Sequence, residues 1–118
     1  MVMVGHLTVP TMDDVPASLS HKIVTNLLRY DLGFRGVIVT DGLQMQALAQ
    51  YTDGEKAVLA LAAGNDMLLE ISDVPGAVAA VEQALADGTL TQAALDASVL
   101  RVLQLKLAHG IVPLPETG

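Results

Sequence analysis

An acidic side chain that directly follows a run of β-branched residues is the strongest candidate for chemistry in this sequence. The run Val37-Ile38-Val39-Thr40 stops at Asp41 and is typical of a buried parallel strand. Proteins of the α/β class place their chemistry at the carboxyl ends of such strands. A carboxylate held there could attack an electrophilic carbon or bind a cation. It could equally cap a helix that begins near Leu43, and position alone leaves these roles open.

Two further polar residues follow expected strands. His6 comes after the apolar run 1–4, and Glu70 comes after the run 66–69. Because the carboxyl ends of parallel strands meet at one edge of a sheet, both residues could lie beside Asp41. His6 could be a ligand there or a hydrogen-bonded packing residue, and Glu70 could line the same site or remain solvated.

The remaining candidates favour structural roles. Asp66 stands at the start of a strand, away from the edge expected to carry chemistry, so we predict a role such as a turn hydrogen bond. Met3, Met45 and Met67 are expected to pack in the core. No spacing of His and carboxylate residues matches a metal site, and no glycine-rich loop could cradle a phosphate. The sequence therefore predicts no metal site and no cofactor.

The elements that must position these residues alternate in type along the chain. Apolar runs predict three strands, and stretches of helical periodicity between N-cap residues and glycines predict the helices. Strands are expected at 1–4, 37–40 and 66–69, and helices at 18–32, 43–50, 53–64, 73–88 and 91–110. The expected N-caps are Ser18 or Ser20, Asp53, Asp73 and Thr91. In the helix at 53–64 the expected inward residues are Val58, Leu61 and Ala62, and the last helix is expected to run through Leu95, Val99, Val102 and Leu103.

This βαβαβα(α) order predicts an α/β fold with three parallel strands joined by right-handed crossovers. Three strands cannot close a barrel, since a (β/α)8 barrel uses eight. The chain is therefore a small open sheet or a piece of something larger. An isolated piece leaves two sheet edges and one apolar face uncovered, and such surfaces drive self-association, so we expect a homo-oligomer.

Composition excludes several classes of protein. The 118 residues are enough for one domain, and 52% hydrophobic residues with only 3% aromatic ones favour aliphatic helices packed on a parallel sheet. A net charge of -7 argues against a nucleic-acid partner. The chain has no cysteine, and no stretch approaches the roughly 20 apolar residues that span a bilayer. The N-terminal residues do not form a signal-peptide pattern, and we expect a cytoplasmic location.

Six short segments, in order, resemble glycoside hydrolase family 3, in the last third of its N-terminal (β/α)8 barrel. Each segment is short, but together they cover nearly the whole chain in register. The form of residues 41–45 and the short tail at 111–118 resemble the single-barrel β-N-acetylhexosaminidase branch. The matching segments are 2–6 (sixth strand), 16–20 (PASLS), 28–36 (LR and LGFRG), 40–41 (the TD pair after strand seven), 63–69 (AGNDMLL, eighth strand) and 98–106 (closing helix).

The resemblance implies residues 1–118 form a single partial barrel domain carrying family strands six to eight. Family members hydrolyse β-linked sugars with retention of configuration, through a covalent glycosyl-enzyme, so the expected partner is a carbohydrate substrate. Asp41 matches the nucleophile. His6 is implied to line the sugar subsite, and Met45 is a further candidate for the same subsite.

The sequence also departs from the family pattern. The KHFPGHG segment and the Asp-His acid/base pair of the hexosaminidase branch precede the sixth strand and are absent here, as are strands one to five. Retaining hydrolysis needs a proton donor about 5 to 5.5 Å from the nucleophile. We therefore expect the chain alone to be inactive and to associate with the missing barrel portion or with itself.

Three alternatives remain open. The chain could be a non-catalytic truncated or designed part-barrel whose only property is assembly. It could be an unrelated small α/β binding domain, although that would not explain six ordered matches. Within the enzyme interpretation, specificity for β-glucosides or β-xylosides is the second candidate, because sugar choice depends on residues upstream.

Overall fold

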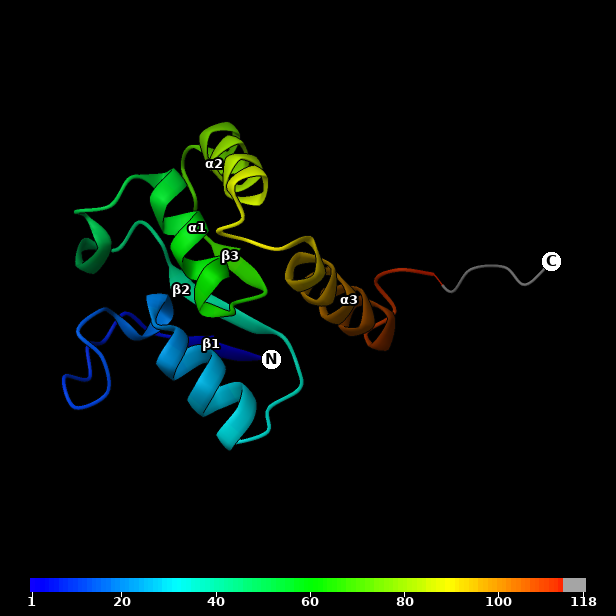
Figure 1. The fold of residues 1–118 in the computed structure, drawn as a ribbon. Helices are drawn as coiled ribbons and strands as arrows, with labels where there is room; N and C mark the ends of the chain where they lie inside the picture. The colour runs from blue at the N-terminus through cyan, green and yellow to red at the C-terminus, as the bar shows by residue number, and fades with distance from the viewer. Residues whose placement is uncertain (114–118) are drawn as a thin grey trace.

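The computed structural model describes residues 1–113. Three short strands alternate with helices, as the sequence predicts, and Figure 1 shows a two-layer body from which the last helix projects. Residues 114–118 of the expected tail lie outside the described residues. The elements in chain order are β1 (Val2–Val4), η1 (Ala17–Leu19), η2 (Lys22–Asp31), β2 (Ile38–Gly42), η3 (Gln46–Leu48), α1 (Asp53–Ala63), β3 (Met67–Leu69), α2 (Val74–Asp87) and α3 (Gln92–Ala108).

The strands form one parallel sheet in the order β1-β2-β3, which confirms the expected topology. Val2 pairs with Ile38 and Val4 with Thr40 in regular register. Between β2 and β3 the register slips, because the three steps from Val39 to Gly42 face the two steps from Met67 to Leu69. One extra residue therefore lies in β2 at Thr40–Asp41. Such a bulge re-aims the side chains beside it and is common next to functional sites.

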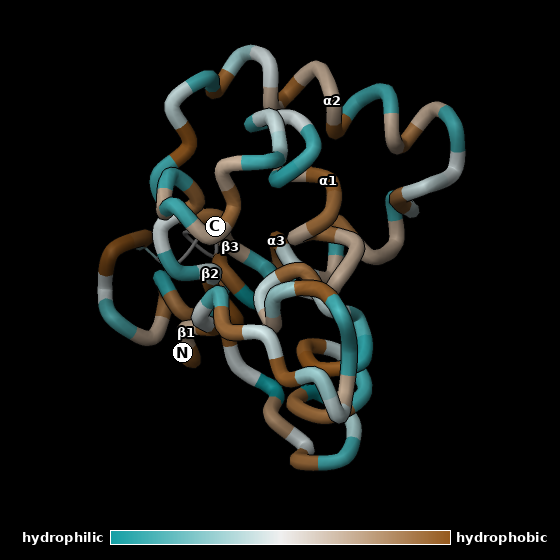
Figure 2. The backbone as a smooth tube through the Cα atoms, turned by 90° about the vertical axis from the view of Figure 1, so that its left-hand side faces the viewer, coloured by the Kyte–Doolittle hydropathy of each residue, from teal (hydrophilic) through white to brown (hydrophobic). Residues whose placement is uncertain are grey.

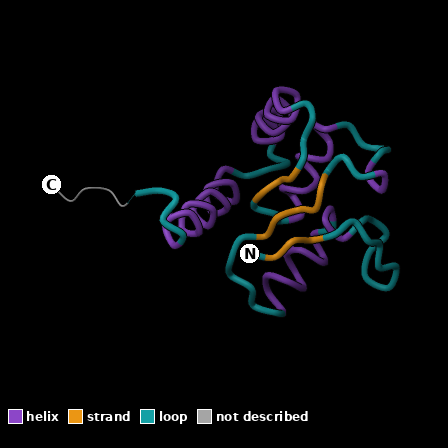
Figure 3. Tube along the Cα trace, turned by 180° about the vertical axis from the view of Figure 1, so that it is seen from behind, coloured by secondary structure: helices purple, strands orange, loops and turns teal. Residues whose placement is uncertain are grey.

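The helices cover one face of the sheet. Val4 and Ile38 pack with Val24 of η2 in one buried cluster, while a second cluster joins Leu19, Leu43 and Leu48 to Ala60 of α1. Seen from behind, in Figure 3, the strands lie in front of the helices. Figure 2 shows that apolar residues dominate the strands and much of α1.

The other face of the sheet is open. Side chains alternate between the two faces of a strand, so Met3 lies opposite to Val4, and Met67 and Leu69 lie opposite to Leu68. Met3 is 55% exposed, Met67 37% and Leu69 38%. The prediction that Met3 and Met67 pack in the core is therefore wrong for this chain, because nothing among residues 1–113 covers the face on which they lie.

The helix caps are mostly those expected. Asp73 and Thr91 each accept a hydrogen bond from the backbone N–H three residues on, at the starts of α2 and α3. Ser20 does the same for Ile23 at the start of η2. This helix is wound more widely than the expected α-helix, since Leu32 N–H bonds to the carbonyl of Leu27, five residues back. No local sequence signal marks this winding.

The start and inner face of α1 differ from the prediction. Thr52, not Asp53, is the N-cap, and it forms a capping box with Glu55. The buried positions are Lys56, Ala57, Ala60 and Ala63, whereas Ala62 is exposed and Val58 and Leu61 are half-buried. Ala60 and Ala63 pack in the two buried clusters, whereas Val58 and Leu61 line grooves toward α2 and α3.

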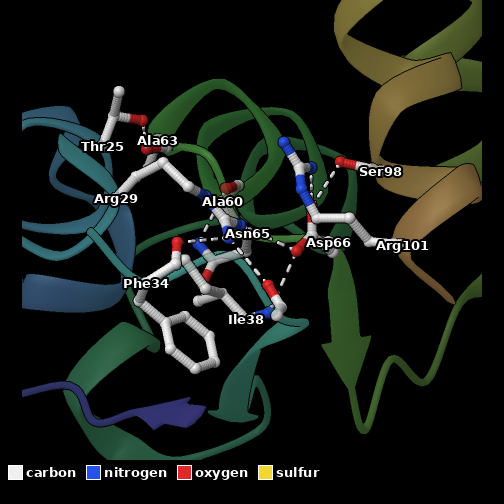
Figure 4. A network of polar contacts seen from close by, with 11 residues as sticks. Thr25, Arg29, Phe34, Ile38, Ala60, Ala63, Asn65, Asp66, Ser98 and Arg101 are labelled. Atoms are coloured by element: carbon white, nitrogen blue, oxygen red, sulfur yellow. Dashed lines mark hydrogen bonds and ion pairs between the residues drawn. The ribbon is translucent and has the colours of Figure 1, made fainter. Parts of the chain in front are cut away.

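Helix α3 is joined to the body through one buried carboxylate. The Asp66 side chain is 0% exposed, and its Oδ1 is 2.7 Å from both Arg101 Nη1 and Ser98 Oγ of α3. Its Oδ2 is 2.9 Å from Arg29 Nη2 and accepts the Ile38 N–H at 3.0 Å. Figure 4 shows Asp66 at the centre of these contacts. The predicted structural role of Asp66 agrees with this arrangement, which links η2, β2 and α3.

No residue of α3 is buried. Leu95, Val99, Val102 and Leu103 therefore lie outside any core here, and Val99 is 49% exposed. The physical reason is that α3 leaves the body after its first turns, so most of its apolar side chains have no surface to pack against within residues 1–113 (Figure 1).

Candidate active site

Asp41 lies at the carboxyl end of β2, in the bulged part of the strand. It is partly buried, and its Oδ1 accepts a hydrogen bond of 2.7 Å from the N–H of Gly42. Among residues 1–113, no hydrogen bond reaches Oδ2. The following helix, η3, begins only at Gln46 and has no side-chain cap, so Asp41 caps no helix. The carboxylate is therefore available for contact with a ligand.

His6 lies at the same edge of the sheet as Asp41. Its ring is buried, with Nε2 at 2.8 Å from the carbonyl oxygen of Gly42 and Nδ1 at 2.6 Å from Ser18 Oγ. A carbonyl oxygen can only accept, so Nε2 carries the proton. In the neutral ring Nδ1 then accepts from the Ser18 hydroxyl. Both ring nitrogens are thus occupied by protein atoms.

The carboxyl end of β3 is fastened beside Asp41 by side-chain and backbone contacts. The Thr40 hydroxyl accepts the N–H of Leu69 at 3.1 Å, and the Leu69 carbonyl accepts the N–H of Leu43 at 2.8 Å. The Glu70 carboxylate lies against the Cα of Gly42, where a Cβ would contact it. Glu70 has a φ of 57°, in the left-handed region that favours glycine. Asp41 and Glu70 therefore share one edge of the sheet.

Met45 lies four residues beyond Asp41, in the turn before η3, and is 45% exposed. The expectation that it packs in the core is therefore wrong. Its N–H bonds to the carbonyl of Gly42 at 3.2 Å, which keeps the turn close to the end of β2. Its role in a sugar subsite remains a prediction.

Asp53 joins the loops that follow β2 and β3. The backbone N–H of Asp73 donates to the Asp53 carboxylate at 2.8 Å. The backbone N–H of Ser72 and the side-chain amide of Gln44 each donate to the same carboxylate at 3.0 Å. The Asp73 N–H, together with Gln44, holds the pKa of Asp53 below its ordinary value of 3.8. Sequence reasoning assigned Asp53 to a cap and missed this role, because its partners lie 9, 19 and 20 residues away along the chain.

Ser18 and Asn65 support the site, a role that the sequence analysis missed although both lie in segments that resemble the family, at 16–20 and 63–69. The carbonyl of Ser18 accepts a bond of 2.7 Å from Asn65 Nδ2, which also donates to the carbonyl of Ala60 at 2.8 Å. All three residues are fully or almost fully buried. A buried polar chain therefore runs from α1 through Ser18 to His6.

Three further observations bear on function. Within residues 1–113, no group of three His, Cys, Asp or Glu side chains could hold a metal ion, and no helix there is long and apolar enough to cross a membrane. A groove of about 290 Å³ lies between η2 and α3 and includes Arg29, Ser98 and Arg101 in its walls. It is thus next to Asp66, at the opposite end of the strands from Asp41.

Comparisons with known proteins agree with these observations. Residues 1–105 match the N-terminal domain of glycosyl hydrolase family 3. The chain is 32% identical over 93% of its length to a β-N-acetylglucosaminidase/β-glucosidase of Cellulomonas fimi. It is 42% identical over 89% of its length to the β-hexosaminidase LpqI of Mycobacterium tuberculosis.

Solved structures give the same result. A family 3 β-N-acetylglucosaminidase from Paenibacillus superposes on 98% of the chain with a TM-score of 0.85 and 33% identity. The chain spans only a part of each of these proteins: 22% of the Cellulomonas protein, 29% of LpqI and 24% of the Paenibacillus chain.

Proposed function

The chain belongs to glycosyl hydrolase family 3, and from that premise we propose that it is the part of a retaining β-glycosidase that bears the nucleophile, Asp41. Its relatives are glycoside hydrolases, both hexosaminidases and glucosidases. The observation that carries the proposal is the position of one carboxylate at the carboxyl end of a parallel strand. Barrel enzymes of this architecture take their catalytic residues from that end.

The contacts of Asp41 suit a nucleophile. Oδ1 is held by the Gly42 N–H, which fixes the plane of the carboxylate, and Oδ2 receives no donor from residues 1–113. In the proposed reaction one carboxylate oxygen attacks the anomeric carbon as the bond to the leaving oxygen breaks. The product is a glycosyl ester on Asp41. Water then attacks the same carbon and releases the sugar with its original configuration.

The first step requires a proton for the leaving oxygen. No residue of this chain matches the family donor, so we propose that the donor comes from the barrel portion that this chain does not span. The chain alone should then hydrolyse ordinary aryl glycosides at no measurable rate. Association with that portion would also cover the open face that includes Met3 and Met67.

We propose N-acetyl-β-hexosaminides as the substrate class, since LpqI and the Paenibacillus relative have that activity in their names. A β-glucoside is the second candidate, because the Cellulomonas relative carries both activities in its name and another relative is a lysosomal β-glucosidase of Dictyostelium discoideum. The alternative that the chain is a non-catalytic part-barrel whose only property is assembly is supported by the open apolar face of the sheet.

A complementation assay tests these proposals. The upstream portion of LpqI, which the chain does not span, is produced together with residues 1–118, and aryl N-acetyl-β-glucosaminide and aryl β-glucoside are offered separately. We expect release of the aryl group only when both parts are present, and more from the hexosaminide. Asp41→Asn should abolish it, and Asp14→Asn, an exposed aspartate in a loop, should not. Equal activity in the Asp41→Asn variant would refute the assignment of the nucleophile.

A further inference from the structure

The backbone of Gly42, the residue after Asp41, is held on both sides of its Cα. The N–H of Gly42 donates to Asp41 Oδ1 at 2.7 Å, and the carbonyl of the same residue accepts from His6 Nε2 at 2.8 Å. Glycine is the residue with the greatest backbone freedom, and this one follows a bulge. The N–H that holds the carboxylate is joined to the Gly42 carbonyl through the two rotatable bonds of Gly42, so a contact that fixes the carbonyl limits how far the N–H can move. His6 supplies the side-chain contact to that carbonyl, which also accepts the Met45 N–H at 3.2 Å.

The His6 ring is itself fixed in one orientation. Ser18 Oγ lies 2.6 Å from Nδ1, and Ser18 is completely buried. Its carbonyl accepts from Asn65 Nδ2 at 2.7 Å, which anchors Ser18 to the segment between α1 and β3. The hydroxyl donor on Nδ1 also selects the tautomer that carries its proton on Nε2, which is the one that Gly42 needs.

We infer that His6 is a positioning residue for Asp41, acting through the backbone of Gly42, and that it does not bind sugar with its ring nitrogens. This inference rests on the proposed role of Asp41 as nucleophile. Both nitrogens are occupied by Ser18 and Gly42, so a sugar hydroxyl could reach neither without breaking a buried hydrogen bond. A misplacement of about 1 Å at a reacting group can cost about 100-fold in rate, which is the scale of the expected effect.

The rival interpretation is that His6 only ties β1 to β2 and stabilises the fold. Three variants separate the two roles. His6→Phe keeps a planar ring and removes both contacts, whereas His6→Gln keeps an amide that can donate to the Gly42 carbonyl. Ser18→Ala leaves the ring in place and removes the hydroxyl that selects its tautomer. His21→Phe is the matched control, because His21 is exposed at the start of η2.

The kinetic test uses the complemented protein described above. His6→Phe should lower kcat by about 100-fold and leave KM within about twofold. The kcat of His6→Gln should be about tenfold higher than that of His6→Phe. Ser18→Ala should lower kcat by about tenfold relative to the parent. His21→Phe should leave both constants unchanged. A rise in KM at constant kcat would show that His6 binds substrate, and an unchanged kcat in both His6→Phe and Ser18→Ala would also overturn the inference.

A second test does not depend on activity. In the 118-residue chain, the Gly42 amide proton should shift as Asp41 is titrated with acid, because the two groups are bonded. His6→Phe should remove that response while amide signals in α2 stay unchanged. If His6→Phe does not fold, Ser18→Ala carries the same test with a smaller loss. A response that persists in the folded variant would overturn the inference. Failure of the complemented parent to hydrolyse any glycoside would instead refute the proposed function.

Discussion

Gly42 carries three contacts that determine how the candidate nucleophile is held. His6 holds its carbonyl, Asp41 accepts its N–H, and the Glu70 carboxylate lies against its Cα. The motif Thr40-Asp41-Gly42 therefore has a separate physical task for each residue. The Thr40 hydroxyl accepts the Leu69 N–H where the register of β2 and β3 shifts. Asp41 supplies the carboxylate, and Gly42, which has no side chain, leaves room for the Glu70 carboxylate.

Gly42→Ala tests whether that room matters. The new Cβ would meet the end of the Glu70 side chain, which is exposed and can move, so we expect a loss of less than about 1 kcal/mol in unfolding free energy. In the complemented protein kcat should fall, because the peptide that holds Asp41 shifts with it. Gly5→Ala is the control, since no atom lies within 4 Å of its added Cβ. Recovery of kcat by Glu70→Ala in the same chain would support the steric cause, and a loss of several kcal/mol would contradict it.

The position of Asp41 could be predicted from the sequence, but its neighbours could not. A β-branched run that ends at an acid is a local signal, and the structure places that acid at a strand end. The contacts of His6 with Ser18 and Gly42 join residues 12 and 36 positions apart. Pairings of that kind depend on the tertiary fold. The one-residue error at the start of α1 has a local cause, because Thr52 and Asp53 are both good caps and only the Glu55 capping box selects Thr52.

At the scale of elements, the buried carboxylate Asp66 joins η2, β2 and α3. Its two oxygens satisfy Arg29 of η2, Arg101 and Ser98 of α3 and the first N–H of β2. Removing one partner of a buried ion pair leaves the charge of the other partner uncompensated. The loss of unfolding free energy therefore depends on which charged groups remain.

Asp66→Ala should lower the unfolding free energy by about 3 kcal/mol, because it leaves two guanidinium groups facing each other without a counter-charge. Ser98→Ala removes one neutral bond to the same carboxylate and should cost only about 1 kcal/mol. Urea unfolding measures both. Hydrogen exchange should also show that amides of α3 lose protection in Asp66→Ala before those of α1. Equal costs for the two variants would contradict the role assigned to Asp66.

The loops after β2 and β3 are joined through Asp53, and this contact should depend on pH. The Asp73 N–H keeps the pKa of Asp53 below 3.8, so the unfolded chain takes up a proton at higher pH than the folded one. Stability from this group is therefore fully present above about pH 4 and is lost as pH falls through the lowered pKa. Asp53→Asn should make the unfolding free energy less sensitive to acidification below about pH 4.

Added salt separates two causes of the lowered pKa of Asp53, its hydrogen bonds and the charge of Lys56. Hydrogen bonds from backbone N–H groups are screened less than the ion pair of Asp53 with Lys56, whose atoms are 3.6 Å apart. The pH dependence should thus persist in 1 M NaCl, where the Debye length is about 3 Å. If Asp53→Asn loses stability on acidification as steeply as the parent chain, Asp53 does not carry this effect.

For the whole molecule, the decisive feature is a sheet covered on one face only. The sequence predicted the three parallel strands and the helices between them, because these follow from local periodicity and from connection rules. It could not predict which apolar residues are buried. Met3 and Val99 have the character of core residues, and whether they are covered depends on surfaces outside residues 1–113.

We expect the isolated chain to self-associate through the open face and edges of its sheet. Sedimentation velocity should show species larger than a monomer that grow with protein concentration. Met3→Lys places a charge on the open face and should reduce association, whereas Leu7→Lys, in a loop where Leu7 is 79% exposed, should not. A monomer at all concentrations, with cooperative unfolding, would argue against this expectation.

The central claim is that Asp41 attacks a sugar, and covalent trapping tests it most directly. A fluorinated β-glycoside with a leaving group that departs without a proton removes the need for the missing donor and slows hydrolysis of the ester. Intact mass spectrometry of the complemented protein should show one added sugar, and peptide mapping should place it on Asp41. The Asp41→Asn variant should gain no mass. A sugar attached to Glu70 or any other residue, or none at all on a protein that still turns over substrate, would contradict the account.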